Sequence, residues 1–171
     1  MYHLLVAQCV ANLEAVEGWL EKAEAFASEN GIAMTTLLEG RLAPDMNGFI
    51  YQVQSACDYV KGGAAWLAGQ TPPAHPDNEQ TLDEVKARIR KTVAFARAID
   101  PSAYDNAAGR YIRMSWKPGM VLRAPDYVSQ MTIPNVYFHL SMAYAILRHQ
   151  GVPLGKMDIW DRMRFVPDPE E

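Results

Sequence analysis

The chain has 171 residues, of which 49% are hydrophobic and 21% are charged. This length suits a single domain with a core of its own, spanning 1–171, and the composition excludes an intrinsically disordered protein. The formal net charge is −4. Nucleic-acid binders rely on clustered Lys and Arg, so we expect no nucleic-acid partner.

The first twenty residues, MYHLLVAQCVANLEAVEGWL, lack the basic start, long apolar stretch and cleavage site of a signal peptide. No run in the sequence approaches the ~18 apolar residues that cross a bilayer, so we expect no membrane partner. Cys9 and Cys57 stand among apolar residues at helical spacing. We interpret both as buried free thiols in a reducing compartment, which favours a cytoplasmic location.

Two helices are predicted in the first seventy residues, because apolar side chains recur there at steps of three and four. The first helix ends at Asn30-Gly31, and the second follows Pro44-Asp45 and ends at Gly69. Gly62 and Gly63 weaken the second helix, and we interpret them as room for a neighbouring helix. The two apolar stripes are Val6, Cys9, Leu13, Val16, Leu20, Ala23 and Ala27, then Phe49, Val53, Ala56, Val60, Ala64 and Leu67.

A proline-rich segment, TPPAHPDNEQ at 71–80, excludes a regular helix there. Thr81 and Glu84 then match a capping box, which predicts the start of a third helix that closes at Asp100-Pro101. Its apolar stripe consists of Leu82, Val85, Ile89, Val93, Ala96 and Ile99.

The next segment alternates polar and apolar residues from Tyr111 to Trp116, turns at Lys117-Pro118-Gly119 and returns through 120–123. This pattern predicts a small hairpin, in which Trp116 and Met120 cover either a pocket or a subunit contact. The fourth helix starts at Pro134 and stops at Gly151. Four amphipathic helices with modest connections predict an all-α fold: an antiparallel up-down four-helix bundle with a β-hairpin inserted before the last helix.

Several catalytic motifs are absent from the sequence. It contains no GxxxxGK or GxGxxG phosphate loop, no HExxH zinc-protease motif, no GxSxG elbow and no CxxC pair. These absences exclude the classes that depend on those motifs.

Among the histidines, His139 has the most informative position. It stands one turn after Asn135 on the apolar face of the fourth helix, so both side chains point the same way. A histidine there is either a hydrogen-bonded core residue or part of a site. Gln52 lies beside the apolar stripe of the second helix, and a buried amide needs partners that His139 or Asn135 supply.

The other histidines carry weaker signals. His75 lies near Asp77 and Glu79 in the proline-rich segment, where these side chains are either metal ligands or solvated turn residues. His149 lies in the last turn of the fourth helix, where an imidazolium complements the helix dipole. His3 has no assigned role.

Two segments resemble a domain-of-unknown-function branch of the DinB/YfiT-like superfamily. They are PNVYFH at 134–139 and YAILRHQGVPLGK at 144–156. The likeness extends, in the same order, through Gln52-Val53, Ala56-Cys57-Asp58, Asp77-x-Glu79 and Ala87-Arg88-Ile89. The resemblance implies a four-helix bundle, often a homodimer.

Better-known members of that superfamily hold a divalent metal with three histidines, one from the second helix and two from a His-x-x-x-His pair. Some of them transfer low-molecular-weight thiols. The resemblance places His139 at the second histidine of the pair, Asn135 at the first and Gln52 near the second-helix position. Two of the three metal positions thus become neutral amides, which are weak ligands for zinc or nickel.

Three hypotheses follow. In the first, Gln52, Asn135 and His139 line a cleft that binds a small molecule without a cofactor, in a binding module or lapsed enzyme. In the second, His139 anchors Zn²⁺ or Ni²⁺ in a thiol-transferase-like enzyme, and His75, Asp77 or Glu79 completes the metal site. In the third, an exposed apolar patch closes a homodimer.

Overall fold

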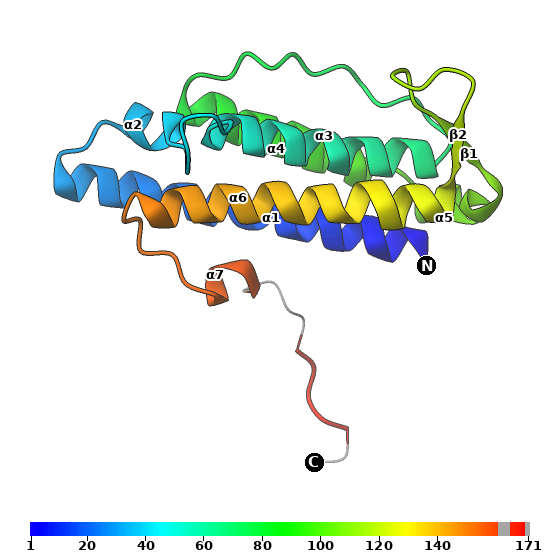
Figure 1. The fold of residues 1–171 in the computed structure, drawn as a ribbon. Helices are drawn as coiled ribbons and strands as arrows, with labels where there is room; N and C mark the ends of the chain where they lie inside the picture. Colours follow the sequence, from blue (N-terminus) through cyan, green and yellow to red (C-terminus); the bar gives the residue numbers. More distant parts are fainter. Residues whose placement is uncertain (161–164, 170–171) are drawn as a thin grey trace.

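A computed structural model describes residues 1–160 and 165–169. Four long helices form the bundle, and short elements fill the connections between them (Figure 1). The all-α bundle with an inserted hairpin, expected from the sequence, is confirmed. The long helices are α1 (Tyr2–Asn30), α3 (Phe49–Leu67), α4 (Leu82–Ala98) and α6 (Ile133–His149), and the short ones are α2 (Met34–Glu39), α5 (Ala124–Tyr127) and α7 (Met157–Trp160).

The connection between α3 and α4 runs back along the length of the bundle, so these two helices point the same way (Figure 1). Ion pairs that join Lys86 to Glu24 and Arg97 to Glu14 show that α4 runs antiparallel to α1. The antiparallel neighbours are therefore α1 with α4 and α3 with α6. The proline-rich segment is therefore a long crossover. The modest connections expected from the sequence predicted a simple up-down order, and that order is wrong at this connection.

The helix ends follow local signals in the sequence. Gly31 takes a φ of 65° directly after α1, a conformation that favours glycine. Thr81 Oγ1 accepts a hydrogen bond from the Glu84 amide, and the Glu84 carboxylate accepts one from the Thr81 amide at 2.9 Å. The predicted capping box is thus confirmed.

The hairpin consists of β1 (Tyr111–Arg113) and β2 (Val121–Arg123), which pair antiparallel with Ile112 opposite Leu122. Two short 3₁₀ turns, η1 (Pro101–Tyr104) and η2 (Ala107–Gly109), lead into it from α4. Ile112 is buried against the bundle, which supports a hairpin too small to be stable alone.

The last long helix starts earlier than Pro134. A π-helical segment, η3 (Val128–Thr132), joins α5 to α6 without a break. Pro134 has no N–H group and its ring crowds the preceding turn, and a widened turn accommodates both effects. A Cβ atom on Gly63 would lie 2.7 Å from Thr132 Cγ2, so the glycine lets this segment approach α3, as the sequence predicts.

The core holds both cysteines as free thiols, which the sequence also predicts. Burial raises the pKa of Cys9 to about 11 and that of Cys57 to about 12, so neither side chain is a thiolate at neutral pH. In the described part of the chain, no helix combines the length and apolar character that crossing a membrane requires.

Candidate functional site

His139 and Gln52 meet between α6 and α3. The Nδ1 atom of His139 lies 2.8 Å from Gln52 Oε1, and the two residues are 8% and 3% exposed. The Gln52 amide nitrogen donates to the Asn47 carbonyl at 3.0 Å. Because that bond fixes the amide group, the amide oxygen faces the imidazole.

This hydrogen bond assigns the tautomer of His139. An amide oxygen only accepts hydrogen bonds, so Nδ1 carries the proton and Nε2 keeps a lone pair in the neutral ring. Burial lowers the pKa of His139, which favours that neutral form at pH 7. The site therefore offers one oriented acceptor, Nε2, in partly apolar surroundings.

Aromatic side chains surround the imidazole. The ring of Tyr59 stacks on it with centroids 5.6 Å apart and planes 17° apart. Phe138 and Tyr51 approach edge-on, at 5.2 and 6.2 Å. Phe138 and Tyr51 are about half exposed, so the aromatic wall extends from the buried pair to the surface. Such a wall suits a flat ligand.

Asn135 does not join the pair. It is half-buried one turn before His139 on α6, and its amide nitrogen donates to the Met131 carbonyl at 2.7 Å. No hydrogen bond connects it to His139 or Gln52 in the described residues. The structure thus brings together two of the three side chains that the sequence assigned to the site.

The side chains expected to complete a metal site lie elsewhere. Asp77 and Glu79 form ion pairs with Arg88 of α4. Burial, followed by the positive charges of Lys61, Lys91 and Arg88, lowers the pKa of His75. The ion pairs hold Asp77 and Glu79 at Arg88, and no hydrogen bond in the described residues joins any of the three side chains to His139.

The residues at His139 do not fit a zinc or nickel site. They supply one imidazole nitrogen and neutral amides, and Gln52 Oε1 already accepts the His139 proton. Across residues 1–160 and 165–169, no group of three His, Cys, Asp or Glu side chains is arranged to hold a metal ion.

The family model "Domain of unknown function (DUF1993)" matches residues 1–160. The chain belongs to the DUF1993 family. This DUF1993 chain is also similar to a crystal structure of a DinB family member protein from Shewanella denitrificans, at 38% identity and a TM-score of 0.93. That match covers 98% of this chain and 95% of the other, whereas the curated proteins gave no match. The resemblance to a DinB-like branch of unknown function is confirmed.

A polar cluster around Arg88, which sequence reasoning missed, lies on another side of α3 in the DUF1993 fold. The Arg88 side chain is completely buried and pairs with Asp77 and Asp58 at 2.8 Å and with Glu79 at 3.3 Å. Gln54 of α3 donates to Glu79 at 2.9 Å. The cluster fastens the crossover segment to α3 and α4. The signal available in the sequence was Arg88 itself, a charged residue directly beside Ile89 in the apolar stripe of the third predicted helix.

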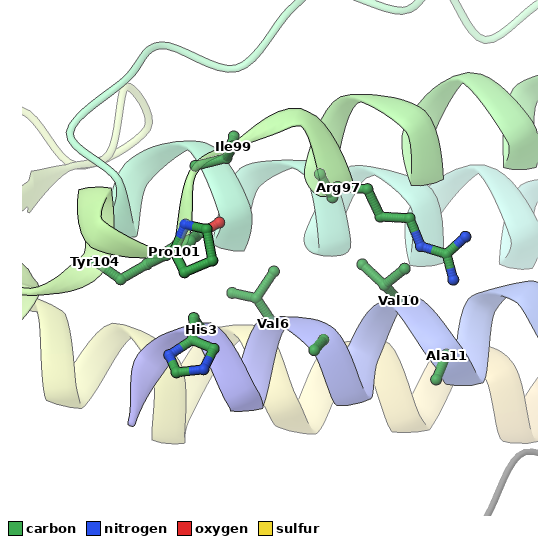
Figure 2. Close-up of a pocket in the computed structure, with 10 residues that line it drawn as sticks. His3, Val6, Val10, Ala11, Arg97, Ile99, Pro101 and Tyr104 are labelled. Atoms are coloured by element: carbon green, nitrogen blue, oxygen red, sulfur yellow. The ribbon is translucent and has the colours of Figure 1, made fainter. Parts of the chain in front are cut away.

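Larger hollows in the described part of the chain lie apart from these clusters. One of about 240 Å³ lies between α1 and the end of α4 (Figure 2). Another, of about 280 Å³, lies under the hairpin, where Trp116 and Met120 form part of its wall as one of the sequence alternatives proposed. The remaining residues of the hairpin cavity are Met114, Lys117, Val121, Leu122, Gln130 and Met131.

Proposed function

We propose that this DUF1993 domain binds a small organic molecule at His139, with Nε2 as the atom that recognises it. The observation that carries the proposal is the 2.8 Å contact between His139 Nδ1 and Gln52 Oε1. In the neutral ring it places the proton on Nδ1 and leaves Nε2 to accept a hydrogen bond, and a preorganised acceptor loses little entropy when a ligand arrives.

The chemistry of the surroundings selects the ligand class. Nε2 accepts, so the ligand carries a hydroxyl or an N–H group. Tyr51 and Phe138 are about half exposed and offer ring edges beside the imidazole, which suits a flat, largely apolar body. The neutral imidazole supplies no charge to bind an anion, so we expect an uncharged ligand.

The test is a ligand screen by thermal shift, followed by titration of any hit against variants. His139→Phe keeps a ring but removes Nε2, and we expect it to weaken binding about tenfold, the value of one good hydrogen bond in a dry site. His149→Gln is the matched control, because His149 is an exposed histidine on the same helix. A hit that binds His139→Phe as tightly as the unmodified chain would refute the assignment.

The metal-dependent enzyme is the alternative from the sequence, and it stays a prediction. It requires stoichiometric Zn²⁺ or Ni²⁺ in protein purified without chelator, and loss of that metal in His139→Ala. Elemental analysis decides between the two hypotheses, since binding through a neutral Nε2 needs no metal.

A homodimer is a second proposal, and exposed aromatic side chains favour it. Tyr51, Tyr137 and Phe138 are 43–53% exposed on α3 and α6, and aromatic side chains are enriched at subunit contacts. Light scattering should give twice the monomer mass for the unmodified chain. For Phe138→Lys it should give the mass of a monomer. A monomer at high protein concentration would contradict this proposal.

A further inference from the structure

The hairpin cavity has no role in the site at His139. It lies at the end of the bundle where β1 and β2 cross over α5 (Figure 1). Its volume is about 280 Å³, and its walls come from the hairpin and from η3. Most of the wall residues are apolar: Met114, Trp116, Met120, Val121, Leu122 and Met131.

The chain leaves much of this apolar wall uncovered. Trp116 is 64% exposed, Met120 is 60% exposed and Val121 is 44% exposed. Large apolar side chains that face water together mark a surface that a ligand or partner covers. Methionine side chains, which recur in this wall, are flexible and adapt to different shapes. The wall therefore suits a flexible hydrocarbon chain.

The charges on the hairpin have one sign. Within a chain of net charge −4, residues 110–123 contain no Asp or Glu and four cations: Arg110, Arg113, Lys117 and Arg123. Arg110 donates to the Ala103 carbonyl at 3.0 Å. The other three are exposed, and none of them forms an ion pair within the described residues.

Two of these cations stand at the cavity. Lys117 belongs to the wall, and Arg113 pairs across the strands with the wall residue Val121. Asp126, the acidic residue nearest in sequence to the wall, accepts a hydrogen bond from the Gln130 amide at 3.3 Å. A ligand that brings a negative charge beside the apolar wall would meet cations that have no counter-charge in the described chain.

We propose that the hairpin cavity binds an anionic amphiphile, a free hydrocarbon chain of medium length that ends in a carboxylate. The hydrocarbon covers Trp116 and the methionines, and the carboxylate meets the ammonium group of Lys117. The stem of a lysine lies along apolar surface while its charge stays in water, so the ligand carboxylate remains partly hydrated. Because a dry cavity of about 150 Å³ holds the six carbons of benzene, about 280 Å³ has room for roughly eight to ten.

Four probes separate the contribution of the hydrocarbon from that of the charge. Octanoate has both, 1-octanol has the hydrocarbon alone, octylammonium reverses the charge, and acetate lacks the hydrocarbon. Each is titrated into the full chain and followed by ¹H–¹⁵N NMR, in which the indole N–H of Trp116 reports on the wall. The Trp116→Phe variant identifies that signal.

The order of affinities is the expected result. Octanoate should shift the Trp116 signal and bind about fivefold more tightly than 1-octanol, the upper range for one exposed ion pair. Octylammonium should bind more weakly than 1-octanol because the hairpin cations repel it. Acetate should leave the signal unchanged, since the ion pair alone is too weak.

Three variants test the assignment. Lys117→Met removes the charge and keeps an apolar stem, so octanoate should fall to the affinity of 1-octanol, which itself should not change. Lys156→Met is the matched control, because it makes the same change of charge at an exposed lysine beside α7, far from the hairpin (Figure 1). Lys156→Met and His139→Phe should leave both affinities unchanged.

Three outcomes would overturn the proposal. The first is a titration to millimolar octanoate that does not shift the Trp116 signal. The second is a preference for octanoate over 1-octanol that Lys117→Met does not reduce. The third is a shift of the Trp116 signal when the protein is diluted without any probe, which would mean that a second copy of the chain covers this wall.

Discussion

Replacing Arg88 with methionine should destabilise the protein severely. The Arg88 side chain is completely buried and pairs with three carboxylates, of which Glu79 is 5% exposed, Asp58 42% and Asp77 57%. The two exposed carboxylates regain water when the arginine is removed, so each contributes no more than about 1 kcal/mol. Glu79 stays buried with only Lys91, 3.9 Å away and partly exposed, as a remaining cation, and we expect a loss of about 3 kcal/mol in the free energy of unfolding.

Urea denaturation measures this loss, with Arg90→Met as the matched control. Arg90 lies half a turn further along α4 and pairs with Glu17 at 2.9 Å, but its side chain is 65% exposed. Its replacement should change the stability little, because solvent screens an exposed ion pair. In a double variant, Arg88→Met with Glu79→Gln, the buried charge is absent, so part of the lost stability should return.

The two single variants decide whether the reasoning holds. If Arg88→Met unfolds at the same urea concentration as Arg90→Met, the buried cluster does not hold the crossover segment against α3 and α4. A double variant less stable than Arg88→Met would show that the buried Glu79 charge is not the source of the loss.

Three further outcomes follow from the packing and charges. Gly63→Ala should cost about 1–3 kcal/mol because its Cβ would lie 2.7 Å from Thr132, whereas Gly18→Ala, with open space around it, should gain up to about 1 kcal/mol in the same unfolding assay. Burial lowers the pKa of His139 below its ordinary 6.5, so unfolding stability should fall as the pH drops below 6.5, and His139→Gln should flatten that slope. Burial by itself raises the pKa of Glu79, but the contacts with Gln54 and Arg88 outweigh it, so the net pKa is lowered. The ionised Glu79 therefore stabilises the fold above pH 4.5, and this stabilisation is lost as the pH falls below 4.5. Glu79→Gln should lack this pH dependence.

The helices could be predicted because their signals are local. The apolar stripes, the glycine at Gly31 and the capping box at Thr81 each act within a few residues. The direction of α4 could not be predicted in the same way. Prolines at 71–80 exclude a helix, but only the contacts of Arg88 with α3 and the crossover show where that segment runs.

The candidate site was predictable in part. Polar residues on apolar stripes, together with the family resemblance, indicated that Gln52 and His139 meet, and they do. Asn135 has a nearer partner four residues earlier, the carbonyl of Met131 in the π-helical segment η3. The part played by Asp77 and Glu79 was not predictable, because it depends on a buried arginine further along the chain.

The most direct measurement of the central claim is a long-range ¹H–¹⁵N NMR spectrum of the histidine rings between pH 5 and 8. The neutral ring of His139 should carry its proton on Nδ1, titrate below the ordinary value of 6.5, and lose this tautomer preference in Gln52→Leu. A proton on Nε2, or a titration at the ordinary pKa, would mean that His139 does not present the free acceptor on which the proposed ligand site depends.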